Sequence, residues 1–254
     1  MDARNNRAAA TFQSSVIQAH LKRLRIRAPI SASEEKALRD LVQETRRSPP
    51  DQEIVHEGEP LEHSLLLLHG WLARAKDRRS GRRQITELHV PGDFADLHGF
   101  TLKRLDHNII TLSDCVIAIV PHERLERLVA DHPRLARLYW FLTNVDAAIH
   151  RQWGFSLGGS PSAARLAHLF CELFVRLEVV GLTRGNSYDF PLTQEELAMC
   201  LGMTSVHVNR SLQELRRSGL IEVESRQVRI PDLPALAQAA QFDPAYLYLD
   251  PIDI

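Results

Sequence analysis

The chain has 254 residues, of which 44% are hydrophobic and 25% are charged, and its formal net charge at pH 7 is -1. These values are typical of a globular protein and exclude a bulk positive charge, so any contact with DNA must come from a local basic patch. The three cysteines, Cys115, Cys171 and Cys200, form no CxxC pair, which argues against a disulfide framework and a cysteine-rich metal cluster. The polar N-terminus and the lack of a long apolar run predict no secretion and no membrane anchor, so we expect a cytoplasmic protein.

The first part of the chain, near residues 12–45, has a helical pattern, with Ser33 and Glu34-Glu35 as the predicted start of a helix. From about Gln52 to Val120 the pattern changes to short apolar runs, "EIV", "LLLLH", "QITELHV", "NIITL" and "CVIAIVP", separated by turn signals. Many short strands at short intervals predict an antiparallel sandwich or barrel. Leu72, Arg74 and Lys76 alternate with small residues, and the following Ser80-Gly81 dipeptide predicts the tip of a hairpin.

The pattern becomes helical again from about Pro121 to Trp153. A short heptad seam with 3-4-3-4 spacing is formed by Leu135, Leu138, Leu142, Val145 and Ile149. A helix packed on its own domain has the same pattern. We favour a dimerisation helix over residues 131–158, because the seam lies between two predicted domains and needs a partner.

The segment "SLGGSPS" (156–162) predicts a break, with Ser160 as an N-cap and Pro161 as the first helical residue of the next helix. We divide the chain here, into an N-terminal sensor domain (1–130), the dimerisation helix (131–158), a C-terminal domain (159–235) and a tail (236–254). An amphipathic helix is predicted over 163–180. The side chains on its buried face are predicted to be Leu166, Leu169, Phe170, Leu173 and Leu177.

The stretch "LTQEELAMCLGMTSVHVNRSLQELRRSGLI" (192–221) predicts two helices joined by a tight turn. Thr193 is a natural N-cap, and Glu196 three residues later completes a capping box. Gly202 stands where the turn favours a left-handed backbone, and Thr204 is placed to cap the second helix. One face of that helix is predicted to be buried through Val208, Leu212 and Leu215. These are the requirements of a helix-turn-helix that reads DNA.

The opposite face of the second helix carries the predicted base contacts. Arg210 is suited to guanine, Val206 to a thymine methyl group, and Asn209 to adenine or a phosphate. Further DNA contacts are assigned to Ser205, Thr204 and His207 on or beside this helix, and to Thr193 and Gln194, which are placed to hold a phosphate at the start of the first helix. A helical hairpin with a solvated polar face is the alternative. The β-like runs of "LIEVESRQVRI" (220–230) favour DNA binding, because they predict a wing after the helix-turn-helix.

In this order of elements the chain resembles the CRP/FNR family of bacterial transcription regulators over roughly residues 50–230. The resemblance is carried by the 192–221 stretch and by "GEPLEHSLLLLHGWLARA" and "PGDFADLHGF". It implies an α+β fold with an N-terminal double-stranded β-helix (a jelly roll like that of cyclic nucleotide-binding domains), a long dimerisation helix and a C-terminal winged helix-turn-helix. It also implies a homodimer on an inverted-repeat site, RNA polymerase as a partner, and Arg210 as the family's recognition arginine.

The predicted sensor domain departs from the family's nucleotide binders. The ribose-binding glutamate is replaced by Leu97 in "GDFADLHGF", and the phosphate-binding Arg-Ser pair by Asp106-His107. An acid is repulsive to a cyclic phosphate. No cysteine cluster for an iron–sulfur centre precedes Cys115. We therefore expect no cofactor, neither cyclic AMP nor an iron–sulfur cluster, and an unknown effector.

The effector pocket is assigned to Asp96, Leu97, His98, Asp106 and His107. Two readings of it stay open: a metal, haem or anion site, or polar residues hydrogen-bonded in an unused pocket, and the second is preferred. Two other functions compete with DNA binding. A cupin-like metalloenzyme would use a His-x-His pair, which residues 52–120 lack, so no enzyme is expected. An interaction module would use the winged helix to bind protein.

Overall fold

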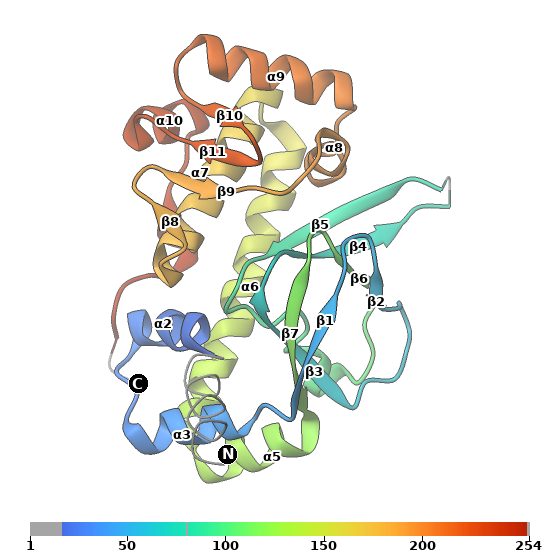
Figure 1. The fold of residues 1–254 in the computed structure, drawn as a ribbon, viewed down its shortest axis with the longest axis vertical. Helices are drawn as coiled ribbons and strands as arrows, with labels where there is room; N and C mark the ends of the chain where they lie inside the picture. Colours follow the sequence, from blue (N-terminus) through green and yellow to red (C-terminus); the bar gives the residue numbers. More distant parts are fainter. Residues whose placement is uncertain (1–16, 80, 253–254) are drawn as a thin grey trace, which may run out of the picture.

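The structure is a computed structural model, and it describes residues 17–79 and 81–252. Residues 12–16 of the predicted first helix, and Ser80 of the predicted hairpin tip, lie outside the described residues. The molecule is elongated, with the β-roll in its lower half, helix α9 (Ser205–Arg217) at the upper end, and the long helix α6 (Pro133–Gly159) running between the two halves (Figure 1).

The β-roll consists of two antiparallel sheets, as the sequence predicts. Their strand orders are β1-β7-β3 and β2-β6-β4-β5. The strands are β1 (Glu44–Ser48), β2 (Glu53–Val55), β3 (His63–His69), β4 (Leu72–Asp77), β5 (Arg83–His89), β6 (Asn108–Thr111) and β7 (Cys115–Pro121), and a short helix α4 (Gly99–Leu102) precedes β6. The roll encloses a core of aliphatic side chains that includes Leu65, Leu67, Leu72, Ile109 and Ile117. Strands β4 and β5 pair as the predicted hairpin.

Two helices precede the roll, α2 (Gln18–Arg27) and α3 (Ala32–Asp40). The predicted helix start at Ser33 is wrong by two residues, because the N-cap of α3 is Ser31. Its hydroxyl accepts a hydrogen bond from Glu34 N, and the Glu34 carboxylate accepts one from Ser31 N, so the two residues form a capping box.

Helix α5 (His122–Asp131) is followed by α6 (Pro133–Gly159), a helix of 27 residues. The predicted break at 156–162 is too wide, because Gly158 and Gly159 still belong to α6. The helix ends at Ser160, which has an extended backbone (φ -80°, ψ 142°). Proline disfavours a helical conformation in the residue before it, so Pro161 accounts for the end of α6. Ser160 is the C-cap of α6 rather than the N-cap of the next helix, whose N-cap position is Pro161.

The predicted seam of α6 is buried within the chain itself. Leu135 and Leu138 pack in a cluster with the N-terminal helices and β7, and Val145 and Ile149 pack in the cluster shared with α7. Leu142 is half-buried beside the first of these clusters. The prediction that this seam is the dimer surface is therefore wrong, because a 3-4 pattern shows that a face is buried but not what covers it. The opposite face is solvent-exposed and carries Trp140, Asn144, Ala147, Arg151 and Phe155.

The C-terminal part begins with α7 (Ser162–Val180), whose predicted inward side chains are all buried. It continues through β8 (Thr183–Arg184), β9 (Ser187–Asp189), α8 (Gln194–Leu201), α9 (Ser205–Arg217), β10 (Glu222–Glu224), β11 (Gln227–Arg229), α10 (Leu233–Ala240) and the 3-10 helix η1 (Pro244–Leu247). The sheet order is β10-β11-β9-β8. The domain boundary predicted at 235 falls inside α10. Leu236 and Leu247 are buried in the core, so the predicted tail from 236 is in large part a packed element.

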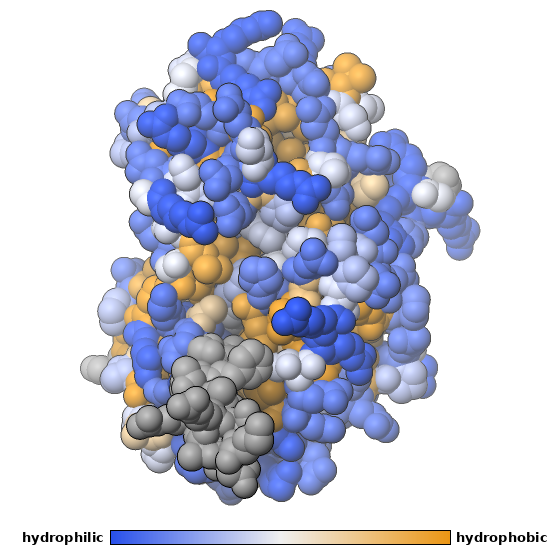
Figure 2. Space-filling view, in the orientation of Figure 1, coloured by the Kyte–Doolittle hydropathy of each residue, from blue (hydrophilic) through white to orange (hydrophobic). Residues whose placement is uncertain are grey.

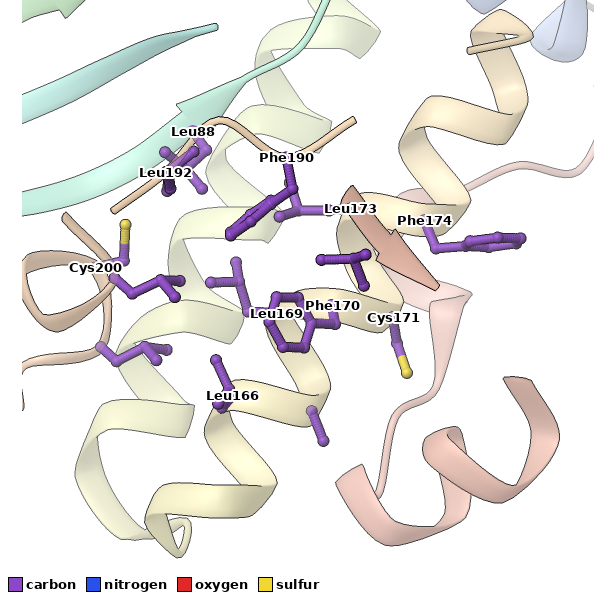
Figure 3. Packing of buried hydrophobic residues seen from close by; sticks show 14 of the residues in the cluster. Leu88, Leu166, Leu169, Phe170, Cys171, Leu173, Phe174, Phe190, Leu192 and Cys200 are labelled. Carbon is purple, nitrogen blue, oxygen red and sulfur yellow. The ribbon is translucent and has the colours of Figure 1, made fainter. Parts of the chain in front are cut away.

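One hydrophobic core joins the β-roll to the C-terminal part. Leu88 of β5 lies close to Leu192, and Phe190 packs beside Leu169 and Phe170 of α7 (Figure 3). The Trp71 ring, which belongs to the roll, meets the Phe190 ring edge-on with 5.9 Å between centroids. In the described part of the chain, no helix is both long enough and apolar enough to cross a membrane.

Candidate nucleic-acid interface and sensor pocket

Both helices of the helix-turn-helix are capped as the sequence predicts. Thr193 Oγ1 accepts a hydrogen bond from Glu196 N (3.2 Å), and Glu196 Oε2 accepts one from Thr193 N (2.6 Å). Gly202 ends α8 in the left-handed region (φ +59°). Thr204 Oγ1 accepts from His207 N (3.3 Å) and thereby caps α9. The two cap threonines therefore use their hydroxyl groups within the fold.

Helix α9 presents a polar outer face to solvent at one end of the molecule. Its inner face is buried through Val208, Leu212 and Leu215. Val206 is 77% exposed, and Arg210 makes no hydrogen bond or ion pair with any residue that the structure describes. Figure 2 shows mainly hydrophilic side chains over the end of the molecule where α9 lies. An unpaired guanidinium on an exposed helix face is free to donate to a ligand.

Some of the predicted DNA-contacting residues are exposed and unbonded in the structure, and others already form hydrogen bonds within the chain. Asn209 Nδ2 donates to Gln194 Oε1 (3.3 Å), so the start of α8 lies beside α9. Asn209 Oδ1 also accepts from Gln213 (2.9 Å), which leaves this amide half-buried and already bonded. His207 Nδ1 lies 3.1 Å from the Thr204 hydroxyl at the cap. Ser205, Val206 and Arg210 are the members of the set that stay exposed without such a bond.

The predicted wing is present as the hairpin of β10 and β11. Its two turn residues, Ser225 (φ +48°) and Arg226 (φ +60°), both have a left-handed backbone, as a tight two-residue hairpin turn requires. Arg216 Nη2 donates to the carbonyl of Val223 (2.7 Å). This bond fixes the wing against the end of the recognition helix.

Only part of the predicted effector pocket converges. Leu97 and His98 line one small cavity, and the rings of His98 and His107 lie 5.5 Å apart. Asp106 is exposed, where its Oδ2 pairs with Lys76 (3.2 Å), and its Oδ1 lies 2.9 Å from His107 Nδ1. The structure therefore brings Asp106 to His107, but Asp106 does not line the cavity.

Asp96 does not line the cavity either. It is fully buried, and its Oδ1 accepts from Leu65 N (2.6 Å), so this carboxyl group holds β3 and does not face an effector. Burial raises the pKa of Asp96 to about 7. A carboxylate without water loses hydration, which favours its neutral form.

The cavity is dominated by an ion pair network that the sequence analysis missed. Arg74 is 2% exposed, and its Nη1 donates to Glu87 Oε2 (2.7 Å) and to Asp146 Oδ2 (2.8 Å). Its Nε donates to the carbonyl of Ala95 (2.7 Å). Arg74 was missed because the period-two pattern groups it with the half-buried Lys76, although strand β4 has a register shift directly after Arg74. Asp146 was missed because it lies on α6, far along the chain.

The histidines around this network are kept neutral. Burial, and next the Arg74 charge, lower the pKa of His98 to about 4. The same two causes, in the same order, lower the pKa values of His89 and His150. Burial also raises the pKa of the Glu87 carboxyl group well above its usual range. Imidazoles in this state keep a free nitrogen lone pair.

A second buried network adjoins the first. Arg176 of α7 donates to Asp93 Oδ2 (2.7 Å), to Glu172 Oε1 (2.9 Å) and to the carbonyl of Leu88 (2.8 Å). Arg23 of α2 also pairs with Asp93. Because these groups come from different elements, the network links the roll to α7 and to the N-terminal helix.

The cavity between the two networks has a volume of about 30 Å³. That volume holds about one water molecule or one ion. The charged side chains of Arg74, Glu87 and Asp146 all line this cavity.

Two family matches cover most of the described chain. Residues 45–132 match the cyclic nucleotide-binding domain, and residues 164–239 match the Crp-like helix-turn-helix domain. The first match covers the roll, and the second covers α7, the helix-turn-helix, the wing and most of α10.

Individual proteins show the same relationship over both domains. The chain is 27% identical to the transcriptional regulatory protein btr of Bordetella pertussis, over 82% of this chain and 85% of that protein. It is 26% identical to the transcriptional activator protein FnrL of Cereibacter sphaeroides, over 83% of this chain and 86% of that protein. Among solved structures, FixK2 from Bradyrhizobium japonicum has a similar fold, with a TM-score of 0.68 and 22% identity over 77% of this chain and 96% of that one.

Proposed function

The chain belongs to the CRP/FNR family of transcription regulators, and we propose that it acts as a homodimer that binds an inverted-repeat promoter site through α9 and recruits or contacts RNA polymerase. The observation that carries the proposal is the outer face of α9, where Arg210 is exposed and unpaired among the described residues. The fixed wing beside it supports the same reading. Arg210 is assigned to a guanine, and Val206 and Ser205 to the neighbouring bases. Asn209, His207, Gln194, Thr193 and Thr204 are assigned to phosphate or flanking contacts.

The proposed dimer surface is the exposed face of α6, in place of the buried seam. Trp140 is 70% exposed and Phe155 is 77% exposed, and Asn144, Ala147 and Arg151 lie between them at 3-4 spacing. Large exposed apolar side chains on a helix otherwise packed on its own chain favour contact with a second helix. Two copies of α6 side by side would place two α9 helices on one face of the DNA.

The regulator is proposed to use neither cyclic AMP nor an iron–sulfur cluster. Leu97 takes the position of the ribose-binding acid, and the Arg74 network occupies the cavity. No catalytic activity is proposed. The enzyme and protein-docking alternatives have no feature in the described residues that favours them over DNA binding.

The decisive experiment is selection of bound sequences from random duplex DNA by the full-length protein. The proposal predicts enrichment of a two-fold symmetric site with half-sites about one helical turn apart. Binding should also weaken as salt rises, because phosphate contacts release counterions. If no sequence is enriched, and the protein does not retard a labelled duplex in a gel, the interaction-module alternative replaces this proposal.

A further inference from the structure

Three metal-ligating side chains meet beside the sensor cavity. Glu87 extends from β5, and Asp146 and His150 lie one turn apart on α6. One ligand atom of each lies within 4.8 Å of those of the other two. His150 Nδ1 is 3.3 Å from Glu87 Oε2 and 4.0 Å from Asp146 Oδ2. Residues four apart on a helix face the same side, so α6 presents an imidazole and a carboxylate to the same point.

A buried donor without a partner faces this group. His89 is 1% exposed, and its Nε2 has no hydrogen-bond partner in the part of the chain that the structure describes. This nitrogen lies 4.0 Å from Glu87 Oε2. Buried polar nitrogens are normally paired, so an unpaired one signals a missing water or ion. Glu87, His89 and Asp146 also line the cavity of about 30 Å³, which suits a single ion.

We propose that Glu87, Asp146 and His150 bind one divalent transition-metal ion, with His89 as a neighbouring fourth donor. Oxygen and imidazole ligands without a thiolate suit Zn²⁺, Mn²⁺ or Fe²⁺. Arg74 keeps its place in this arrangement. Each carboxylate oxygen has two lone pairs, so it accepts a hydrogen bond from Arg74 and still ligates an ion. Arg74 then orients the two carboxylates from outside the ligand set.

The site would connect two moving parts of the regulator, and this consequence rests on the proposed function. Glu87 belongs to β5, whose hairpin contacts α8, while Asp146 and His150 belong to α6, the proposed dimer helix. A bound ion would bridge the strand and the helix and so favour one relative position of them. The regulator would thereby respond to the availability of a divalent metal.

The test is calorimetric titration of Zn²⁺, and separately of Mn²⁺, into the full-length protein after removal of metal by a chelator. We expect one ion per chain for at least one of the two metals. His150→Ala and Asp146→Asn are each expected to weaken binding at least tenfold, since each removes one ligand. His56→Ala is the matched control, because His56 also pairs with a carboxylate, Glu53 (2.7 Å), but at the surface and without a third ligand.

If neither metal binds, the proposed site is overturned. It is also overturned if both ligand variants lose less than tenfold in metal affinity. If His150→Ala does not fold, as judged by circular dichroism, the nearly isosteric Asp146→Asn decides alone. Gel shifts with the selected duplex, with and without the bound metal, separate the two proposals. Intact DNA binding without metal binding overturns the site and leaves the proposed function. Intact metal binding without DNA binding overturns the proposed function and leaves the site.

Discussion

Gln84, in the β4–β5 hairpin of the roll, donates a hydrogen bond from its Nε2 to the backbone carbonyl of Met199 in the last turn of α8. The same nitrogen lies 3.5 Å from the carbonyl of Cys200. The last carbonyls of a helix have no partner within the helix, so this side chain satisfies groups that would otherwise need water. The sensor domain therefore holds the first helix of the DNA-reading motif directly.

Gln84→Ala is expected to loosen the end of α8 without unfolding the protein. Hydrogen bonds of this kind contribute about 0.5–1.5 kcal/mol. Local opening should become more frequent, so the backbone amides of Gly202 and Met203, which bond to Ala198 in the described structure, should exchange hydrogen several-fold faster. Gln213→Ala is the control, since among the described residues the Gln213 side chain bonds only to Asn209 on the same helix, α9. Equal exchange rates in wild type and Gln84→Ala would contradict the role of the hairpin.

Arg210→Ala should weaken binding to the selected site by about 1–3 kcal/mol and relax the preference at one base pair. Arg217→Ala is the matched control on the same helix. Arg217 is also exposed, but it lies in the last turn of α9, so its loss should weaken specific and random DNA alike. Quantitative gel shifts on both kinds of duplex check this. An equal loss on both for Arg210→Ala would rule out base readout by Arg210.

Phe155→Asp should give a folded monomer, because Phe155 lies on the exposed face of α6. Leu138→Asp should instead unfold the protein, since Leu138 is fully buried in the chain's own core and a buried unpaired charge is strongly unfavourable. Sedimentation velocity with circular dichroism distinguishes the two results. A Phe155→Asp variant that remains dimeric would place the dimer contact elsewhere.

Asp96→Asn should change how stability depends on pH. The pKa of Asp96 is about 7 in the folded chain and 3.8 for the unperturbed carboxyl group. Between these values the unfolded chain releases the proton while the folded chain keeps it, so rising pH favours unfolding through this group. Asparagine stays neutral and its carbonyl oxygen can still accept from Leu65 N. As the pH rises from about 4 to about 8, the free energy of unfolding of the variant should therefore increase by about 2–4 kcal/mol relative to that of the wild type.

Urea denaturation at several pH values measures this difference. Other buried groups, such as Glu87, are present in both proteins, so their contributions to the pH dependence largely cancel. A stability difference that stays constant across the range would show that Asp96 is ionised in the folded chain.

Arg74→Met should destabilise the fold by about 3–5 kcal/mol, because it leaves the buried Glu87 and the half-buried Asp146 carboxylates without their partner. Lys76→Met is the control two residues along the same strand. Lys76 pairs with Asp106 at the surface, where an ion pair contributes at most about 1 kcal/mol. Thermal unfolding of the two variants tests this contrast. Similar losses of stability in both would show that the Arg74 ion pairs do not stabilise the fold more than a surface ion pair does.

The order of domains and the caps of the helix-turn-helix were predictable because their signals are local. Thr193, Glu196 and Gly202 act through residues within one or two turns, so their roles can be read from spacing. The seam of α6 was assigned to the wrong partner because burial of Leu138 depends on the N-terminal helices, which are distant in sequence. Glu87 and His150 were not predicted as a pair for the same reason. A strand and a helix bring them together, and neither segment shows this by itself.

The edge-on contact between Trp71 and Phe190 makes the fluorescence of Trp71 sensitive to the arrangement of the two domains. The Trp71 indole is almost fully shielded, and the ring that covers one side of it belongs to the DNA-reading half. Movement of that half away from the roll would transfer the indole from an apolar to an aqueous surrounding. The intrinsic fluorescence of Trp71 should then shift to longer wavelength, whereas the exposed Trp140 is already in water. A signal that separates the two halves would thus be visible without any added label.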